Sequence, residues 1–322
     1  MTLQTILESH RDTVPASAAL IARGDDVEFA AVGESRDTVF PIASITKPIV
    51  AAAATLLVRD GEMGLDDPIA NWLPELANPL VVRTPASEIA DVVPATRPIT
   101  VRHLLTSRSG WGFTADFSLP ATAKLFEEAH LHGRADLPSP DEWLKQLAQV
   151  PLLHQPGDGW LYNTGYDVLG VLADRVTGSL PGYLADRFYE PLGMTNTSFV
   201  SDVLPSGAGG LKSTVDDLLA FYRFLLTSDL LPQLATDTTS EQEREAAHIF
   251  LEGQGWGIGG SVDVAEIDPW NSPGRYGWVG GSGTAAHVVP AQGMVTVLLT
   301  RTAMTSPTPT AIMRDFWRYA AR

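Results

Sequence analysis

Ser44 and Lys47 are the residues of this chain whose types and spacing point most directly to catalysis. Three positions apart on a helix, they lie on one face and within hydrogen-bond reach of each other. A serine hydroxyl is a poor nucleophile at neutral pH until a neighbouring base takes its proton, and a lysine whose pKa is lowered by partial burial can take part in that activation. The spacing alone is weak evidence, because with four lysines in the chain a chance match arises in roughly a quarter of cases.

The residues around Ser44 predict the N-terminus of a helix. Residues 39–43 are typical of a short extended segment, and residues 49–58 form an Ala-rich apolar run with good helix propensity. Pro48 falls in the first turn, where its missing N–H is not needed. Ser44 then lies where free backbone N–H groups favour developing negative charge. Since the run is almost entirely apolar, the helix should be buried, and polar groups at its mouth are costly unless they have a function.

Composition narrows the class of protein. With 322 residues and 44% hydrophobic content, the chain is long enough for one large domain or two coupled domains. The formal net charge of −16 disfavours a nucleic-acid partner. The absence of cysteine excludes disulfides and thiolate chemistry. No apolar run approaches the length of a membrane span.

The N-terminal residues predict an amphipathic helix with Leu3, Ile6, Leu7 and His10 on one face. Glu8 and the lack of an apolar core argue against a signal peptide. Together with the composition, this predicts a soluble, cytoplasmic protein without a membrane partner.

The order of the elements predicts an α+β fold. Two strands, 18–23 and 27–32, form a hairpin ahead of the Ser44 helix. Helical patterns then dominate, at residues 101–106, 121–131, 141–149, 166–177, 182–188 and 214–226. Strands return at 256–264, 277–290 and 294–301, and a last helix is expected at 309–321.

This order predicts a central antiparallel sheet, flanked by helices and assembled from both ends of the chain. Residues 1–60 and 250–322 would form the sheet domain, and residues 61–249 an inserted, mainly helical domain. The active site would lie in the cleft between the two.

Two further stretches strengthen the Ser44 motif. Tyr162-Asn163-Thr164 runs into a helix, and Trp278-Val279-Gly280-Gly281 begins a strand. Together with Ser44-x-x-Lys47 they resemble the three motifs of the serine β-lactamase and penicillin-recognising superfamily. The closest likeness is to class C β-lactamase-like esterases, the family VIII carboxylesterases, and it extends over nearly the whole chain. The resemblance implies the β-lactamase/transpeptidase-like fold and no cofactor.

The resemblance also implies roles for individual residues. Ser44 would be the acylated nucleophile, Lys47 its hydrogen-bonded partner and Tyr162 the residue that moves the proton between nucleophile and leaving group. We expect the adjacent ammonium to lower the pKa of the tyrosine from about 10 toward the working range. The N–H groups of Ser44 and Gly281 would form the oxyanion hole, because glycine lets a substrate carbonyl approach the backbone.

The predicted substrate-binding residues are Asn163, Thr164, Trp278 and Gly280, and two of their positions depart from the family pattern. The second motif usually reads Tyr-x-Asn, whereas here the asparagine stands one place early or Thr164 replaces it. The third motif usually begins with Lys or His and here begins with Trp278. The usual amide holds the side-chain amide of a β-lactam and the usual cation holds its carboxylate. Their loss favours a neutral ester or lactone.

The sequence therefore predicts a serine hydrolase that acts through an acyl-enzyme on small molecules, most of all short-chain esters or lactones. A β-lactamase and a D-amino-acid peptidase or amide hydrolase stay open, since Arg275 or Arg301 could supply the missing positive charge. An alternative of another class is a non-catalytic binding or self-assembling scaffold, which has no reason to keep Ser44, Lys47 and Tyr162 together.

Two other patterns carry little weight. Residues 255–260 satisfy G-x-G-x-x-G, but the residues after them alternate like a strand, whereas a dinucleotide site needs a helix there. His130 and His132 would diverge on a helix, so we predict no metal site.

The first prediction is that Ser44→Ala abolishes both turnover and labelling by a fluorophosphonate probe while the fold stays intact, because the hydroxyl is the atom that is acylated. Ser282 lies in a similar glycine-rich setting, and Ser282→Ala should keep most of the activity. Substantial turnover by the Ser44→Ala protein would contradict the assignment.

Overall fold

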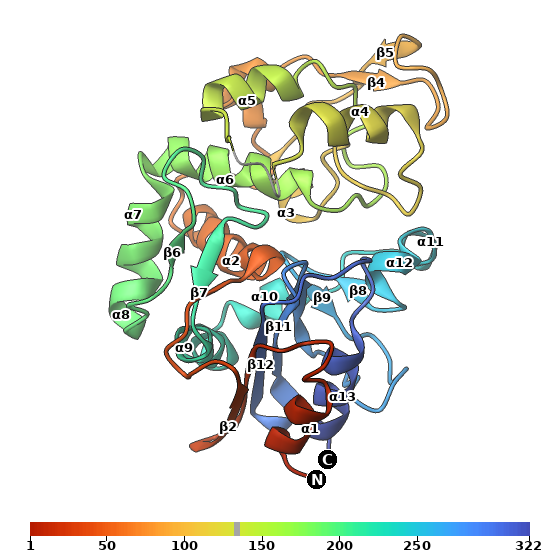
Figure 1. The fold of residues 1–322 in the computed structure, drawn as a ribbon. Helices are drawn as coiled ribbons and strands as arrows, with labels where there is room; N and C mark the ends of the chain where they lie inside the picture. The colour runs from red at the N-terminus through yellow and green to blue at the C-terminus, as the bar shows by residue number, and fades with distance from the viewer. Residues whose placement is uncertain (132–135) are drawn as a thin grey trace.

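The computed structural model describes residues 1–131 and 136–322, so that His132 lies outside the described residues. A seven-stranded antiparallel sheet has the order β2-β1-β12-β11-β10-β9-β8. Its strands are β1 (Ser17–Arg23), β2 (Asp26–Val32), β8 (Gly255–Trp256), β9 (Ser261–Val262), β10 (Tyr276–Gly280), β11 (Thr284–Val289) and β12 (Met294–Thr300). Because β1 pairs with β12 over its whole length, strands from the two ends of the chain lie side by side in one sheet, as predicted (Figure 1).

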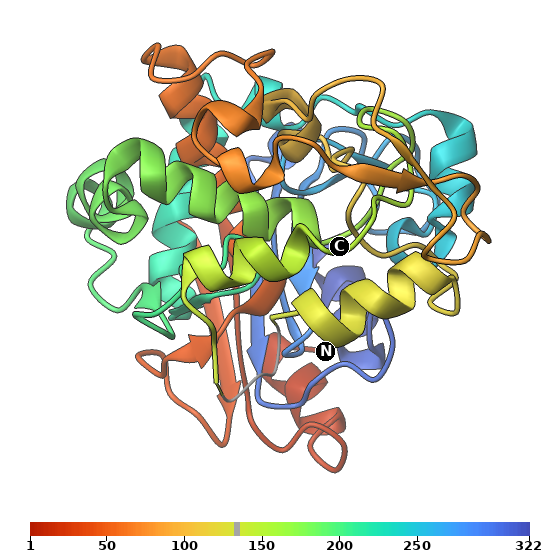
Figure 2. The ribbon, with the colours of Figure 1, turned by 90° about the horizontal axis from the view of Figure 1, so that it is seen from above.

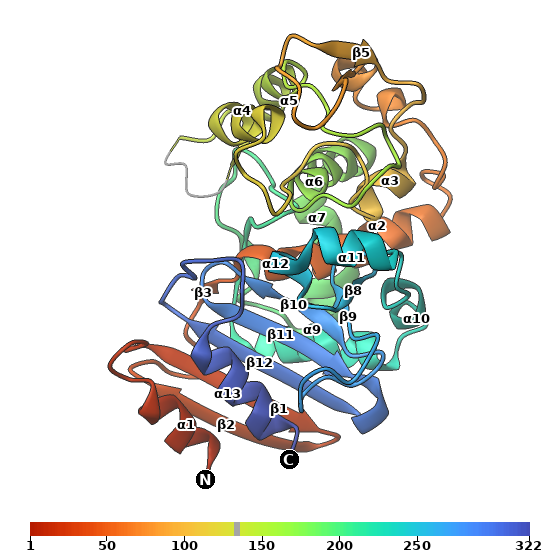
Figure 3. The same cartoon turned by 90° about the vertical axis from the view of Figure 1, so that its right-hand side faces the viewer.

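Helices cover both faces of this sheet. α1 (Leu3–Ser9) and α13 (Ala311–Ala320) contact each other and pack on one face, whereas α9 (Val215–Thr227) packs against β11, β12 and β1 from the other (Figure 3). Buried Leu3, Ile6 and Leu7 confirm the predicted apolar face of α1. The division at residues 61–249 stays a prediction, and α9 lies inside that range although it packs on the sheet.

A second, mainly helical part lies above the sheet and to its left in Figure 1. It includes α3 (Val101–Leu105), α4 (Pro120–Ala129), α5 (Pro140–Leu147), α6 (Thr164–Thr177), α7 (Leu180–Leu184), a π-helical turn (Ala185–Tyr189) and α8 (Glu190–Leu192). A small sheet pairs β4 (Leu80–Val82) with β5 (Val92–Pro94), and another has the order β3-β7-β6. Its strands are β3 (Phe40–Pro41), β6 (Ser198–Phe199) and β7 (Leu211–Ser213). Seen from above, α4, α5 and α6 lie over the sheet (Figure 2).

The β segments near the C-terminus differ from the prediction in detail. The strand expected at 256–264 is a short hairpin of β8 and β9, because residues 257–260 turn between them. The strand expected at 277–290 is two strands, β10 and β11, with Gly283 (φ +85°) in the connecting turn. The short helices α10 (Leu231–Leu234), α11 (Glu241–Ala246) and α12 (His248–Leu251) precede this region.

α2 (Thr46–Arg59) is the central element of the molecule. Ile49 and Val50, like the alanines at 51–54, have no exposed surface, which confirms the predicted buried helix. α2 contacts α6 and α7 and lies between the sheet and the helices above it (Figure 1). Within the described residues, no helix has the length and apolar character needed to cross a membrane.

Candidate active site

Ser44 stands in a single 3₁₀ turn, Ala43–Ile45, that leads directly into α2. The turn presents the serine at the predicted helix N-terminus, facing the helical part of the molecule. Ala43 has φ 45°, a left-handed conformation that costs a residue with a Cβ about 1–3 kcal/mol. Asn163, directly after Tyr162, has φ 81°. Backbone strain therefore lies beside both motif residues, where the surrounding structure must hold it.

Lys47 is fully buried, and its amine donates three hydrogen bonds. Its Nζ donates to Ser44 Oγ at 2.9 Å and to Asn163 Oδ1 at 2.8 Å. A third bond, of 2.6 Å, runs to the carbonyl oxygen of Ala208. The Nζ also lies 4.6 Å from the centre of the Tyr162 ring. The structure thus brings together the three residues that the motifs single out.

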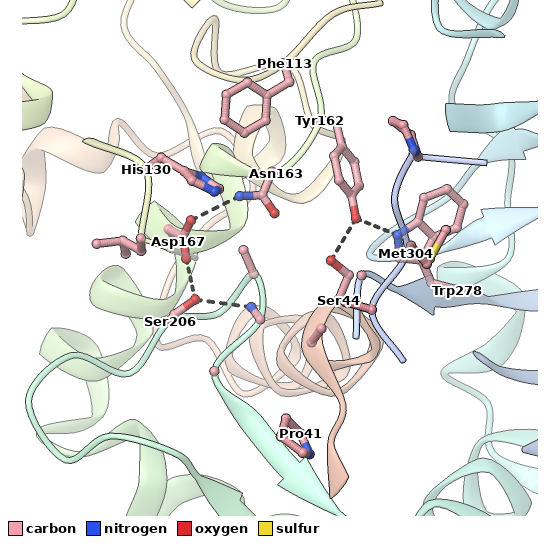
Figure 4. Close-up of a pocket in the computed structure, with 18 of the residues that line it drawn as sticks. Pro41, Ser44, Phe113, His130, Tyr162, Asn163, Asp167, Ser206, Trp278 and Met304 are labelled. Carbon is pink, nitrogen blue, oxygen red and sulfur yellow. Dashed lines mark hydrogen bonds between the residues drawn. The ribbon is translucent and has the colours of Figure 1, made fainter. Parts of the chain in front are cut away.

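Tyr162 reaches Ser44 from the segment directly before α6. Its hydroxyl donates to Ser44 Oγ at 2.8 Å and accepts a bond of 2.7 Å from the indole Nε1 of Trp278 (Figure 4). Trp278, on β10, was predicted to contact substrate, and it also holds the tyrosine hydroxyl in place. Sequence reasoning missed this second contact.

The pKa values in the site are governed by burial. Desolvation lowers the pKa of Lys47 from 10.5 to about 7, although the nearby carboxylate of Asp167 works in the opposite direction. Burial raises the pKa of Tyr162 from 10.0 to about 12. The prediction that the tyrosine pKa is lowered was therefore wrong, since desolvation of the phenolate outweighs the hydrogen bonds with Ser44 and Trp278, which act in the opposite direction. At neutral pH Tyr162 is a neutral phenol, and Lys47 is the group near its titration point.

Asp167 is a buried acid beside this centre that the motifs did not reveal. Its carboxylate accepts from Ser206 Oγ at 2.5 Å and from Asn163 Nδ2 at 3.5 Å (Figure 4). Burial raises its pKa, while the Ser206 hydroxyl and Lys47 oppose the rise. A signal was present in the sequence, because an acid four residues after Asn163 lies on the same helix face within a run that is otherwise mostly apolar.

Asn163 and Thr164 are placed differently. The Asn163 side chain lines the cavity, with its oxygen on Lys47 and its amide toward Asp167. Thr164 is buried as the first residue of α6 and is not among the residues that line the cavity. Of the two candidates for the missing asparagine of the motif, the structure brings Asn163 to the site.

The two glycines of the third motif, Gly280 and Gly281, have different surroundings. A Cβ at Gly280 would overlap Thr284 Oγ1 and the carbonyl oxygen of Ile42, so Gly280 lets β10 pack closely against the Ser44 turn. Gly281 lines the cavity, and a Cβ there would meet no atom within 4 Å. Gly281 thus faces open space beside Ser44, and Gly280 serves the packing that brings it there.

The cavity in front of Ser44 has a volume of about 510 Å³. It lies between the helical part and the sheet, and most of its lining is apolar and aromatic. Within the described residues, the lining contains neither lysine nor arginine. Likewise, no group of three or more His, Asp or Glu side chains in the described parts of the chain is placed to hold a metal ion.

The two arginines that sequence reasoning left open lie elsewhere. Arg275 is buried behind Trp278, 3.7 Å from Asp263, in a separate small cavity. Arg301 pairs with Glu34 and lies over the ring of Phe40. Neither lines the cavity at Ser44, so neither is placed to hold the carboxylate of a substrate there.

The chain is similar to known proteins along most of its length. The beta-lactamase family model matches residues 3–315. Protein Rv1367c of Mycobacterium tuberculosis is 34% identical over 322 residues, which cover 84% of this chain and 79% of that protein. Esterase EstB of Burkholderia gladioli is 30% identical over 324 residues, which cover 83% of this chain and 78% of that protein. The solved structure of EstCE1, a hydrolase with promiscuous acyltransferase activity, has a TM-score of 0.79 at 23% identity, covers 99% of this chain and 97% of its own, and shows a shared fold.

The second prediction separates the two glycines. Gly280→Ala should lower the free energy of unfolding by roughly 1–3 kcal/mol, the usual cost of overpacking, and should reduce activity because β10 must move away from the Ser44 turn. Gly281→Ala meets no steric obstacle and should unfold like the unmodified protein, which makes it the matched control. Urea unfolding of both variants measures the difference. Equal stability of the two would contradict the packing role of Gly280.

Proposed function

This chain belongs to the beta-lactamase family, and from that premise we propose that it is a serine esterase, which forms an acyl-enzyme on Ser44 and acts on neutral esters or lactones. The observation that carries the proposal is the pair of hydrogen bonds on Ser44 Oγ. One comes from a buried amine of lowered pKa and the other from a neutral tyrosine. A nucleophile between a base and an acid is the arrangement that acyl transfer requires.

The acylation step follows from the contacts of Lys47. A neutral amine has two N–H bonds and one lone pair. Asn163 Oδ1 and the carbonyl oxygen of Ala208 can only accept, so they keep the two N–H bonds when the ammonium, which donates to all three partners, loses a proton. The lone pair then faces Ser44, whose hydroxyl donates to Nζ in place of accepting from it. Lys47 then accepts the serine proton as Oγ attacks the ester carbonyl.

Tyr162 completes the step on the leaving-group side. As a neutral phenol it donates its proton to the alcohol oxygen when the carbon–oxygen bond breaks. The phenolate is neutralised by the proton that Lys47 has taken, which restores both groups. The developing oxyanion would be held by the N–H groups of Ser44 and Gly281, in line with the place of Gly281 in the cavity. Water in place of the alcohol reverses the sequence and releases the acid.

The choice of esters over β-lactams rests on what the cavity lacks. The Asn163 oxygen is used by Lys47, and its amide points to Asp167 and not freely into the cavity. Trp278 stands where the family usually has a cation, and no lysine or arginine lines the described part of the cavity. A substrate carboxylate would lose its hydration without a partner there.

Acyl transfer to an alcohol is a second candidate, favoured by one observation. The cavity wall is mainly apolar, so an organic alcohol gains more than water does from entering it. The chemistry is the same, with the alcohol replacing water as the acceptor. A non-catalytic scaffold is disfavoured, because burying Lys47 costs stability that a scaffold would not need to give up.

The third prediction concerns pH. Lys47 acts as a base only when deprotonated, and burial lowers its pKa to about 7. The kcat/KM for a neutral ester should therefore rise with pH, reach half its plateau near pH 7, and not fall again until the pKa of Tyr162, about 12, is approached. A half-maximum near pH 10, the value of a solvated lysine, would contradict this assignment.

A variant of Asp167 tests the effect of its carboxylate on the pH profile of kcat/KM. Asp167→Asn removes a negative charge that favours the ammonium form, so the acid limb should move to lower pH. Asp186 is exposed and does not line the cavity, and Asp186→Asn is the matched control, with an unchanged profile expected. If kcat/KM of the Asp167→Asn protein reached half its plateau at the same pH as the unmodified protein, the carboxylate of Asp167 would not affect the pKa of Lys47.

The fourth prediction tests substrate charge. Neutral nitrophenyl butyrate should be hydrolysed with a kcat/KM at least roughly a hundredfold above that of anionic nitrocefin, about 2.7 kcal/mol, the scale of one missing charged hydrogen bond. Trp278→Lys should narrow the gap by adding a cation. Trp278→Phe is the control, since it loses the bond to Tyr162 without adding charge and should slow both substrates alike. Similar efficiency on the two substrates in the unmodified protein would favour a β-lactamase.

A further inference from the structure

The cavity at Ser44 is much larger than a short-chain ester needs. At about 510 Å³ it falls within the range of sites that bury a drug-sized ligand, roughly 300–1,000 Å³. Resting on the proposed function, we propose that the substrate is a neutral ester in which one of the two halves, acyl or alcohol, carries a bulky apolar ring system. The short-chain prediction from the sequence would then describe esters that are accepted but that fill only part of the site.

One side of the cavity is an aromatic wall, defined here as Phe113, Phe117, Phe126 and His130. The ring centre of Phe113 lies 5.6 Å from that of Phe117, 6.0 Å from that of Phe126 and 5.4 Å from that of His130. Phe126 and His130 stack at 4.8 Å. All four line the cavity, and Figure 4 shows Phe113 and His130 on the far side of Ser44 from Met304 and Trp278.

Such a wall favours rings over linear chains for two reasons. Aromatic faces and edges make stacked and edge-on contacts that are worth more than their buried area alone. A ring system also has few rotatable bonds to immobilise, whereas each ordered bond of a long chain costs conformational entropy on binding. Met304, on the other side, has an adaptable side chain that fits irregular ring shapes.

The rim of the cavity is a second, independent observation. Phe117, Phe126 and Val200 line the cavity, yet 42%, 53% and 59% of their surface is exposed to solvent. Large apolar side chains in water at the edge of a pocket mark a surface that a ligand covers. Short esters at Ser44 would leave these side chains in water, whereas a ring system that extends from Ser44 to the rim would bury them.

Charge limits the substrate further. The described lining offers no lysine or arginine to an anionic ring substituent, and Asp167 lines the same cavity. The formal net charge of the chain is −16. The ring-bearing half should therefore be uncharged.

Two series of matched esters test the proposal by kcat/KM. In the first, acetates of ethanol, n-heptanol and cyclohexylmethanol vary the alcohol while every leaving group is a primary alkanol. In the second, ethyl esters of acetic, octanoic and cyclohexylacetic acid vary the acyl half. In at least one series the ring ester should exceed the smallest ester by roughly tenfold or more, and the linear ester of equal carbon number by several-fold. The series that responds identifies the ring-bearing half; a ring ester without advantage in either series overturns the proposal.

Variants of the wall give a second readout. Phe117→Ala and Phe126→Ala should each lower kcat/KM for the preferred ring ester roughly fivefold to tenfold, mainly through KM, and should lower kcat/KM for ethyl acetate by a clearly smaller factor. Both side chains are partly exposed, so the variants should fold. Leu80 on β4 is 48% exposed and is not part of the cavity, and Leu80→Ala should change neither substrate. Equal losses on both esters, or no loss, overturn the role of the wall.

Failure of this inference can be told apart from failure of the proposed function. A protein that is labelled at Ser44 by a fluorophosphonate and hydrolyses ethyl acetate, but shows no ring preference, is an esterase without this substrate class. A protein that is neither labelled nor active on any of these esters overturns both.

Discussion

The burial of the Lys47 amine is the constraint on which the rest of the site depends. A lysine with no exposed surface must either lose its proton or find partners that replace water. Here three acceptors surround Nζ, and one carboxylate, that of Asp167, lies close enough to oppose deprotonation. The result is an amine poised between its two states. A fully solvated lysine would stay protonated at neutral pH, and a buried one without partners would destabilise the fold.

This constraint explains why segments far apart in the sequence converge on one point. The 3₁₀ turn before α2 supplies Ser44 and the first turn of α2 supplies Lys47. The segment that leads into α6 supplies Tyr162 and Asn163, and β10 supplies Trp278. The positive φ angles at Ala43 and Asn163 show that the chain accepts local strain to aim these groups. The packing that offsets the strain is the apolar body of α2, held between sheet and helices.

Much of this could be predicted from the sequence, because the signals are local. The hairpin of β1 and β2 follows from two strand-like runs on either side of a glycine turn, and the buried α2 follows from an apolar run behind a proline. Asp167 was missed because its importance depends on the burial of the whole first part of α6, residues 164–173, which is a tertiary property. The pKa of Tyr162 was predicted in the wrong direction for the same reason, since the motif shows a neighbouring amine but not how completely the phenol is removed from water. The break between β10 and β11 was missed because both strands are apolar and the turn glycines carry no alternation.

Trp278 links the choice of substrate to the choice of base. A cation at its position would attract a substrate carboxylate and, through its charge, would lower the pKa of the adjacent tyrosine. The indole instead gives Tyr162 a hydrogen bond without a charge, so burial keeps the phenol neutral. In the proposed acylation step, the neutral tyrosine therefore donates its proton to the leaving group, and the lysine is the group that accepts the proton of the serine. In the proposed function, the residue that leaves an anionic substrate without a partner therefore also leaves Lys47 as the base, so that the proposed preference for neutral esters and the proposed activation by Lys47 both depend on Trp278.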